Sequence, residues 1–245
     1  MKKNNYKKGF SLIELTIVVV IMSLLFVVFS VSERVVENGR LINAINLTAQ
    51  QPNIIENNKL ALWLETSMSS REKKDGYKLL DWDDLSKNKI LFVASNSQNY
   101  QTFKEKRTFP GIKSVYFNGH NPMVSKKSLN LLAYTIFVVS KPESNNAGTI
   151  IQSGFKITAD DVKDSLITVI RNDGDIKKIK KGLKKEFETV EEKQNHDNFN
   201  DRPGEVVIGD NGFEGEIFEI IVFDSALDND DVNKIEKYLY RKYIN

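Results

Sequence analysis

Cysteine is absent from the 245 residues of this chain, and histidine occurs only twice. The lack of thiols excludes disulfides, thiolate zinc sites and cysteine nucleophiles. The two histidines, His120 and His196, are too few for a histidine-rich metal site, and neither has a partner pattern for catalysis. A glycine-rich phosphate-binding loop is also missing, which excludes a P-loop ATPase.

Net charge is small as well. The 35 basic and 33 acidic residues leave a formal charge of +2, so bulk charge makes nucleic acid an unlikely partner. Hydrophobic residues make up 40% of the chain and aromatic residues 10%, which excludes disorder throughout. The strongest hydrophobicity lies between residues 10 and 31, so the amino terminus needs its own explanation.

Residues 10–31 contain a single ionisable side chain, Glu14. About twenty residues in a helix rise about 30 Å, the thickness of a bilayer's hydrocarbon core. Lysines precede the span and none lies within it, which places the leader in the cytoplasm. We therefore predict a single-pass protein of the inner (cytoplasmic) membrane, with its bulk in the periplasm or outside the cell.

Two simpler explanations of the span compete with a specialised signal. An ordinary secretory signal would be shorter and would end in small residues, whereas Glu33 and Arg34 follow here. A plain membrane anchor is the stronger alternative. Glu14 argues against it, because a carboxylate in a lipid-facing helix costs about 3 kcal/mol on insertion scales and usually has a specific partner.

The segment Lys7-Lys8-Gly9-Phe10-Ser11-Leu12-Ile13-Glu14-Leu15 resembles the prepilin signal of type IV pilins, pseudopilins and competence pilins. The resemblance implies that a prepilin peptidase cuts between Gly9 and Phe10 and that the new amino-terminal Phe10 is methylated. Glu14 then takes the fifth mature position, which is glutamate in most of the family. Its carboxylate would neutralise the Phe10 amine of a neighbouring pilin or pseudopilin subunit during assembly.

The apolar helix is predicted to continue beyond the membrane as an amphipathic one, to about Gln50. Its apolar residues recur at three- and four-residue spacing: Val31, Val35, Val36, Leu41, Ile42, Ile45 and Leu47. Pro52 marks its end, and Gly39 is a place where it would bend or weaken. We therefore divide the chain into a leader (1–9), a pilin helix (10–52, membrane part about 10–31) and a second domain (58–245).

Beyond residue 58, short apolar runs alternate with polar turns, which predicts a mainly β fold, an antiparallel sandwich. The predicted strands are 60–64, 90–93, 114–117, 134–139, 149–152, 166–170, 205–208 and 215–223. Asp173-Gly174 and Asn211-Gly212 predict tight hairpins.

A short helix closes the chain. Asp228 or Asn229 is its predicted cap, and Asp230 and Asp231 lie in its predicted first turn. The helix dipole suits this charge order, because the basic residues fall toward the carboxyl end: Lys237, Arg241 and Lys242. Its predicted apolar stripe is Val232, Ile235, Leu239 and Tyr243.

Residues 59–64, 82–86, 114–119, 134–142 and the closing 213–224 resemble the laminin G-like, concanavalin A-like lectin family. The resemblance spans nearly all of 58–245 and implies a jelly-roll sandwich of two curved antiparallel sheets. It does not fix a ligand, because fold does not determine function.

The motif Glu214-Gly215-Glu216-Ile217-Phe218-Glu219 mimics the Glu-x-Asp-x-x-Glu of glucan hydrolases with the lectin-like sandwich. Retaining hydrolysis needs two carboxyl groups about 5–5.5 Å apart. Residues 214 and 219 point to opposite faces of a regular strand, so a bulge would be required. We expect Glu219 to serve packing and hydrogen bonding, and predict that the chain is not an enzyme; a glycoside hydrolase is the less favoured alternative.

Two groups of aspartates are candidate ligand sites. Calcium is a candidate cofactor, with oxygen ligands from Asp81, Asp83 and Asp84, or from Asp224, Asp228, Asp230 and Asp231. Neither set has EF-hand spacing, and a helix start explains the second better. Trp63 and Trp82 are predicted to pack in the core rather than to stack on a sugar.

A polar stretch, residues 171–203, carries a run of lysines followed by a run of glutamates. We predict a solvated hairpin in which the opposite charges offset each other; the alternative is a basic patch for an anionic glycan or phosphate surface.

These observations predict a minor pilin or pseudopilin that displays a lectin-like sandwich on a filament. The alternative function is an adhesin that binds a glycan or surface receptor and uses the helix for display. The large size of the second domain favours a minor or adhesive subunit over a bulk building block.

Overall fold

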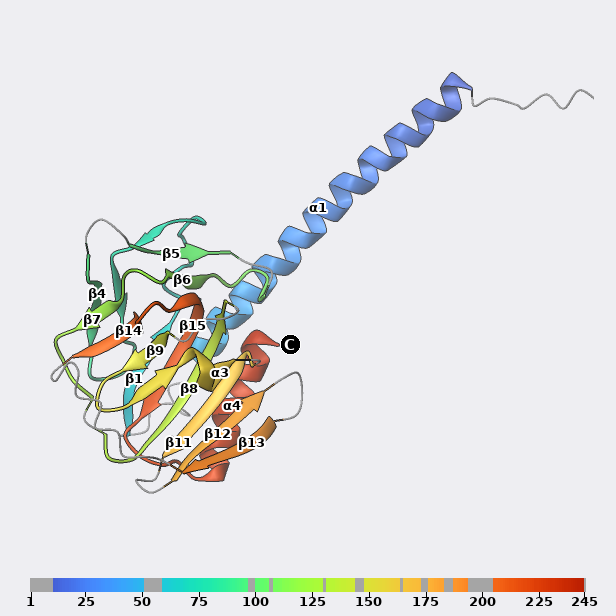
Figure 1. The fold of residues 1–245 in the computed structure, drawn as a ribbon. Helices are drawn as coiled ribbons and strands as arrows, with labels where there is room; N and C mark the ends of the chain where they lie inside the picture. The colour runs from blue at the N-terminus through green and yellow to red at the C-terminus, as the bar shows by residue number, and fades with distance from the viewer. Residues whose placement is uncertain are drawn as a thin grey trace, which may run out of the picture.

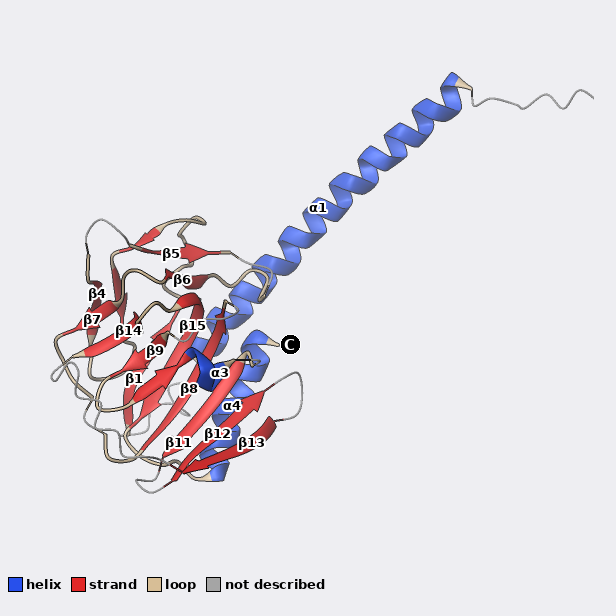
Figure 2. Cartoon of the chain, viewed as in Figure 1, coloured by secondary structure: helices blue, strands red, loops and turns tan. Residues whose placement is uncertain are grey.

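The protein has a long helix that projects from a β-rich head (Figure 1). The computed structural model describes residues 11–50, 59–96, 100–105, 108–129, 131–143, 148–163, 165–172, 176–182, 187–193 and 205–244; for 176–182 and 187–193 only the backbone is described. We call the helix the stem and residues 59–244 the head. Strands dominate the head, with short helices beside them (Figure 2).

The stem is helix α1 (Leu12–Ala49), with Ser11 as its N-cap and Gln50 as its C-cap. Its 38 residues rise about 57 Å, close to the predicted length. The helix continues through Gly39 without interruption, so the predicted weak point does not break it. Pro52 lies outside the described residues.

The described strands form two antiparallel sheets, which confirms the predicted mainly β fold. The larger sheet has the order β13-β12-β11-β8-β15-β6-β5-β2, with β1 paired to β15. Its strands are β1 (Leu60–Glu65), β2 (Lys78–Leu79), β5 (Gln101–Lys104), β6 (Ser114–Asn118), β8 (Tyr134–Pro142), β11 (Ile167–Asn172), β12 (Ile176–Gly182), β13 (Phe187–Lys193) and β15 (Glu214–Phe223).

The smaller sheet has the order β10-β9-β14-β7-β4-β3. Its strands are β3 (Asp81–Asp83), β4 (Leu91–Ala94), β7 (Met123–Ser125), β9 (Thr149–Gln152), β10 (Lys156–Thr158) and β14 (Val206–Asp210). A one-turn helix, α3 (Ala159–Val162), follows β10.

Two apolar cores hold these layers together. The first lies between the sheets and takes large side chains from both, such as Phe92 of β4 and Phe117 of β6. The second lies on the outer face of the larger sheet, where Phe137 and Ile221 pack under the helices. Helix α4 (Asn229–Tyr243) and the end of the stem cover this face, so the head is a sandwich with a third, helical layer.

Helix α4 begins where the sequence predicts. Asp228 is its N-cap and accepts a hydrogen bond from the Asp231 backbone at 2.8 Å. The four residues of the predicted stripe are all buried. Arg241 and Lys242 lie in the last turn of α4, as predicted. Lys242 is also buried there, because carboxylates of the larger sheet lie beneath this turn.

The Asn211-Gly212 turn forms, but it does not close a hairpin. Both residues have positive φ, 51° and 80°, as a tight turn of this type requires. However, β14 pairs with β7 and β9, whereas β15 pairs with β1, β6 and β8. The turn therefore carries the chain from one sheet to the other; local turn chemistry fixes the reversal and leaves the choice of partner to tertiary packing.

The polar stretch forms the paired strands β12 and β13 at one edge of the larger sheet. Their register places Lys177 opposite Glu192, Lys178 opposite Glu191, and Lys181 opposite Glu188. This arrangement supports the predicted hairpin in which charges of opposite sign offset each other. Asp173-Gly174 lies outside the described residues, but β11 and β12 on either side of it are paired.

Candidate functional site

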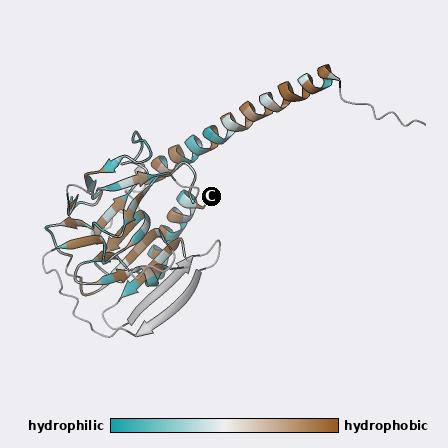
Figure 3. Ribbon diagram, turned by 45° about the horizontal axis from the view of Figure 1, so that its top comes forward, coloured by the Kyte–Doolittle hydropathy of each residue, from teal (hydrophilic) through white to brown (hydrophobic). Residues whose placement is uncertain are grey.

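The membrane half of the stem is coloured largely as hydrophobic in Figure 3, and nearly all of its apolar side chains are exposed. Leu12 is 82% exposed and Phe26 is 73% exposed. It is the one helix among the described residues that is long and apolar enough to cross a membrane, by length and composition. Apolar surface of this extent marks contact with lipid or with other proteins.

The stem begins with a capping box that sequence reasoning missed. The Ser11 hydroxyl accepts from the Glu14 backbone N–H at 3.2 Å, and the Ser11 backbone N–H donates to Glu14 Oε2 at 2.8 Å. The signal was present in the sequence as Ser-x-x-Glu before an apolar run. Glu14 therefore has a partner within its own chain. Gly9 and Phe10 lie outside the described residues, so the predicted cleavage and assembly roles stay predictions.

The other end of the stem docks on the head. Ala44 and Thr48 are buried there, and the Thr48 hydroxyl lies 3.3 Å from the Tyr238 hydroxyl of α4. Gly111 approaches the stem so closely that a Cβ atom would overlap the carbonyl oxygen of Glu37. Its φ of 85° is also one that glycine adopts readily and other residues rarely. The junction therefore involves the stem from Glu37 to Thr48.

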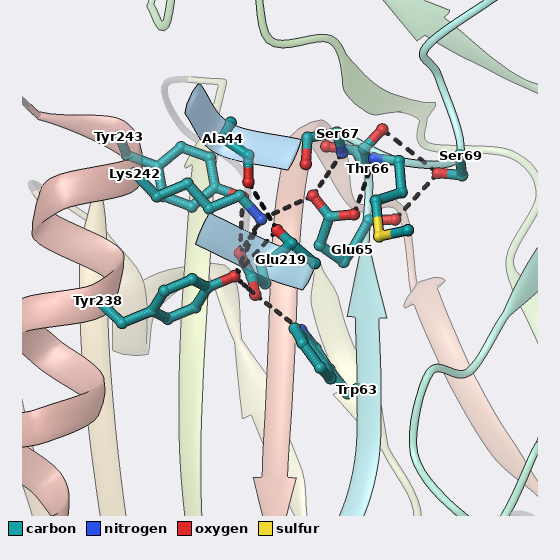
Figure 4. A network of polar contacts seen from close by, with 12 residues as sticks. Ala44, Trp63, Glu65, Thr66, Ser67, Ser69, Glu219, Tyr238, Lys242 and Tyr243 are labelled. Atoms are coloured by element: carbon teal, nitrogen blue, oxygen red, sulfur yellow. Dashed lines mark hydrogen bonds and ion pairs between the residues drawn. The ribbon is translucent and has the colours of Figure 1, made fainter. Parts of the chain in front are cut away.

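A buried polar network lies beneath this junction, centred on Glu219 of β15 (Figure 4). Glu219 Oε1 accepts from Trp63 Nε1 at 2.7 Å and from the Tyr238 hydroxyl at 2.9 Å. Its Oε2 accepts from Lys242 Nζ and from the Tyr243 hydroxyl, each at 2.8 Å. These donors come from β1 and α4, so Glu219 ties the sheet to the helix that receives the stem.

Lys242 joins Glu219 to a second buried carboxylate, Glu65. The Lys242 ammonium lies 2.6 Å from Glu65 Oε1, and the backbone N–H groups of Ser67 and Met68 also donate to this carboxylate. All three charged side chains have 0% exposure. Buried charges are tolerated at this depth only when they are paired and hydrogen-bonded, as they are here.

The tyrosines of the network act as donors over a wide pH range. Burial raises the pKa of Tyr238 and Tyr243 well above 10, and the nearby charges of Glu219 and Glu65 raise it further. Both hydroxyls therefore stay protonated at neutral pH. Such groups hold a carboxylate in place and are unsuited to proton transfer near pH 7.

The glucanase-like motif does not form a retaining pair from Glu214 and Glu219. A register shift between Ile217 and Glu219 does supply the strand irregularity that such a pair would need. However, Glu214 is exposed at the start of β15, about 16 Å along the strand from Glu219 at about 3.3 Å per residue. Glu219 is also fully engaged in the network, as expected for a glutamate that serves packing and hydrogen bonding.

Two of the candidate calcium ligands, Asp84 and Asp228, have other roles. Asp84 is buried and binds backbone groups of its own loop, whereas Asp81 and Asp83 are exposed in β3. Asp228 caps α4. Within the part of the chain that the structure describes, no three acidic or histidine side chains gather as a metal site would need.

The two tryptophans are buried, which confirms the predicted core packing. Trp82 Nε1 donates to the Glu65 backbone carbonyl at 3.1 Å, and Trp63 Nε1 belongs to the Glu219 network. His120 is exposed, and His196 lies outside the described residues.

A cavity of about 190 Å³ opens between the stem and the head, lined by residues such as Arg40, Phe109 and Tyr243. It is smaller than the roughly 300–1,000 Å³ of a typical small-molecule site.

Comparison with known families identifies the amino terminus. Residues 4–30 match the prokaryotic N-terminal methylation motif, a type IV pilin signal. Together with the apolar helix, this match supports a membrane-anchored, type IV pilin-like subunit that a prepilin peptidase processes. No curated protein matches the chain.

Solved structures resemble the fold at very low sequence identity. A mutant GH54 α-L-arabinofuranosidase soaked with 4-nitrophenyl α-L-arabinofuranoside aligns with a TM-score of 0.50 and 8% identity, over 75% of this chain and 59% of that one. The same enzyme with a cyclic sulfate inhibitor gives 0.48 and 9%, over 75% and 59%. The binding domain of botulinum neurotoxin DC in complex with SialylT gives 0.41 and 12%, over 77% and 53%. The chain spans 59% of the length of the arabinofuranosidase, and the first of these likenesses concerns the fold alone.

Proposed function

We propose that this chain is a minor pilin or pseudopilin, a filament subunit that displays a lectin-like sandwich. The proposal depends on one observation: the methylation motif at residues 4–30 overlaps the first half of helix α1, whose apolar side chains are exposed there. Such a helix is stable in the membrane before assembly and against other stems afterwards. The head has one core between its sheets and a second core to which Ala44 of the stem also contributes, so the head is attached to the end of the stem.

Processing after Gly9 is the first step of this function. The peptidase removes the lysine-rich leader, and methylation of Phe10 follows. Mass spectrometry of the mature protein tests this directly, with a chain that begins at N-methylated Phe10 as the expected result. Gly9→Leu should leave the precursor uncut, whereas Gly39→Ala, on an open face of the same helix, should be processed normally. Another amino terminus, or normal cutting of the Gly9 variant, would contradict the proposal.

The second candidate function is an adhesin, and the head is the observation that favours it. Its two-sheet fold and the segments that resemble the laminin G-like, concanavalin A-like family support a lectin-like module. A glycan array probed with the full chain in detergent tests this function. Saturable binding of one glycan class supports it, and an array without binding contradicts the glycan form of it.

A further inference from the structure

The Lys242 ammonium lies between the carboxylates of Glu65 and Glu219, inside the head and away from solvent (Figure 4). Its Nζ donates to Glu65 Oε1 at 2.6 Å and to Glu219 Oε2 at 2.8 Å. The rings of Tyr238 and Tyr243 lie beside it, with centroids 5.5 and 5.2 Å from Nζ. One cation therefore meets two anions where bulk water does not reach, and each of these charges is costly to keep buried.

Lys242 and Glu65 are close enough to form an amide bond. A carbon–oxygen bond of about 1.23 Å places Lys242 Nζ within about 4 Å of Glu65 Cδ. Reacting atoms in a near-attack arrangement are about 3–3.5 Å apart, and groups held in this way reach effective molarities of about 10⁵–10⁸ M. The amine and the carboxyl carbon are therefore positioned for reaction by the fold itself.

The Glu65 carboxyl group is polarised by the backbone. The N–H of Ser67 donates to Oε1, and the N–H of Met68 donates to Oε2 at 3.0 Å. Fixed amide donors of this kind stabilise the negative charge that develops on the oxygens when a nucleophile adds to the carbon. Glu65 is therefore better suited than Glu219 to accept the Lys242 amine, because the donors to Glu219 are side chains.

Glu219 is placed to move protons on the reacting nitrogen. Its Oε2 lies 2.8 Å from Lys242 Nζ, within the range of about 2.6–3.2 Å that a general base requires. Hydrogen bonds from Trp63, Tyr238 and Tyr243 hold the carboxylate in this position. The geometry thus supplies a nucleophile, a polarised carboxyl group and an acid–base group.

We propose that Lys242 and Glu65 condense to an intramolecular amide, an isopeptide bond, with Glu219 as the acid–base group. One ammonium proton passes from Nζ to Glu65 Oε1, and the neutral amine attacks Cδ. Glu219 takes a second proton from the nitrogen and returns it to Oε1. The Cδ–Nζ bond forms, the Cδ–Oε1 bond breaks, and Oε1 leaves as water. The third proton stays on the amide nitrogen, so atoms and charge balance without any co-reactant.

The bond relieves the cost of the buried charges. Condensation removes two of the three charges and leaves Glu219 with its tyrosine and tryptophan donors. Exclusion of water from the site also protects the amide from hydrolysis. The product joins β1 to α4, the helix on which the stem docks, across 177 positions of the chain. It is a single self-modification without turnover, and it does not depend on the pilin function.

Intact-mass spectrometry of the folded full chain, purified in detergent and denatured only for the measurement, tests the bond. The wild type should be one water lighter than its sequence requires, after any removal of the leader is accounted for. Lys242→Arg keeps the cation but offers a guanidinium group that does not form the amide, so it should have its full mass. Lys237→Arg, on the exposed side of the same helix, is the matched control and should still lack one water.

A tryptic map of the wild type locates the bond without any variant. Trypsin does not cut after an acylated lysine, so peptide 60–71, which contains Glu65, should be joined to the peptide that begins at Lys242. A succinimide at Asp173-Gly174 also loses one water, but it would lie in the peptide that contains those two residues. A wild type of full mass, or a lost water that maps to any other site, overturns the proposal and leaves the three side chains as an ion network.

Glu219→Gln tests the acid–base role, because glutamine keeps the hydrogen-bonding shape but cannot carry the proton. Newly expressed Glu219→Gln should lose water at least about 100-fold more slowly than the wild type. Tryptophan fluorescence shows whether the variant is folded, since both tryptophans are buried in the head. A folded Glu219→Gln that condenses at the rate of the wild type would overturn the role of Glu219.

Discussion

The stem and the head use apolar side chains in opposite ways. The stem exposes them along its membrane half, whereas the head buries them in two cores. The apolar side chains of the head are therefore covered within the chain, partly by the end of the stem itself. The apolar side chains of the first half of the stem are stabilised only when lipid or another helix covers them. The comparison shows that one chain combines a packed domain with a surface that needs a partner.

Charged side chains show the same contrast. Glu14 of the stem has the Ser11 backbone as its partner at an exposed helix end, whereas Glu219 and Glu65 of the head share Lys242 in a sealed network. In the head, the buried carboxylates are therefore paired with a lysine of the same chain. At the stem, the proposed second partner of the Glu14 carboxylate is the Phe10 amine of a neighbouring subunit.

Replacement of Lys242 should have the largest effect on stability, because it removes the cation that pairs with Glu65 and Glu219. Lys242→Met leaves two buried carboxylates without their cation and should destabilise the head by about 3–5 kcal/mol. Thermal unfolding followed by tryptophan fluorescence measures this, since both tryptophans lie in the head. Lys237→Met, on the exposed side of the same helix, is the matched control.

A second variant keeps this prediction testable if Lys242→Met fails to fold. Adding Glu65→Gln and Glu219→Gln removes both stranded charges and should restore much of the lost stability. Equal stability of Lys242→Met and Lys237→Met would show that the network contributes nothing.

High pH should weaken the head through its buried tyrosines. Their pKa is raised above 10 in the folded state, so their contribution is complete below pH 10 and is lost as pH rises toward the folded pKa. Above pH 10, each tyrosine should lower the free energy of unfolding by about 1.4 kcal/mol per pH unit. Urea unfolding from pH 9 to 11.5 measures the slope. A Tyr238→Phe, Tyr243→Phe variant with an unchanged slope would assign the loss to other groups.

The sequence predicted the long apolar strands well and the short polar ones poorly. Runs such as 134–139 and 215–223 lie at the centre of the larger sheet, where continuous burial leaves a strong signal. The strands that were not predicted are short or polar, such as β2 and β3 at sheet edges and the β12–β13 pair. Their conformation depends on a neighbour that the local sequence does not specify.

The polar network could be foreseen only in part. Glu219 was expected to bond within the fold, but Lys242 was predicted only as a basic residue near the end of the last helix and not as the partner of Glu219. Lys242 and Glu65 are 177 residues apart, so no local spacing relates them. The capping box at Ser11 and Glu14, by contrast, is a short-range pattern that the sequence does contain.

The junction between the two regions should respond to Gly111→Ala. Gly76→Ala is a close control, because Gly76 has a φ of 74° but nothing near its missing Cβ, whereas at Gly111 the new Cβ meets the stem backbone. Both variants carry the cost of positive φ, about 1–2 kcal/mol. Gly111→Ala should lose about 1–3 kcal/mol more through overpacking. Hydrogen exchange of residues 37–48 should rise only in this variant; equal behaviour of the two would mean that the stem does not dock there.

Glu14→Gln should have the smallest effect on the head and a selective effect on assembly. Glutamine can still accept the bond from the Ser11 backbone, so the capping box persists while the charge is lost. We expect unfolding of the head to change by less than about 0.5 kcal/mol, as for substitutions away from special features. Filament incorporation should fall, because the Phe10 amine of the neighbouring subunit would lack its counter-charge.

Ser11→Ala is the complementary variant, because it removes the capping hydroxyl and leaves the carboxylate. It should cost the helix end about 1 kcal/mol and leave incorporation largely intact. Immunoblots of sheared filaments measure both variants at equal expression. If Ser11→Ala abolished incorporation while Glu14→Gln retained it, the role of Glu14 would be to cap its own helix. The charge of Glu14 would then be stabilised within its own chain, as the buried charges of the head are.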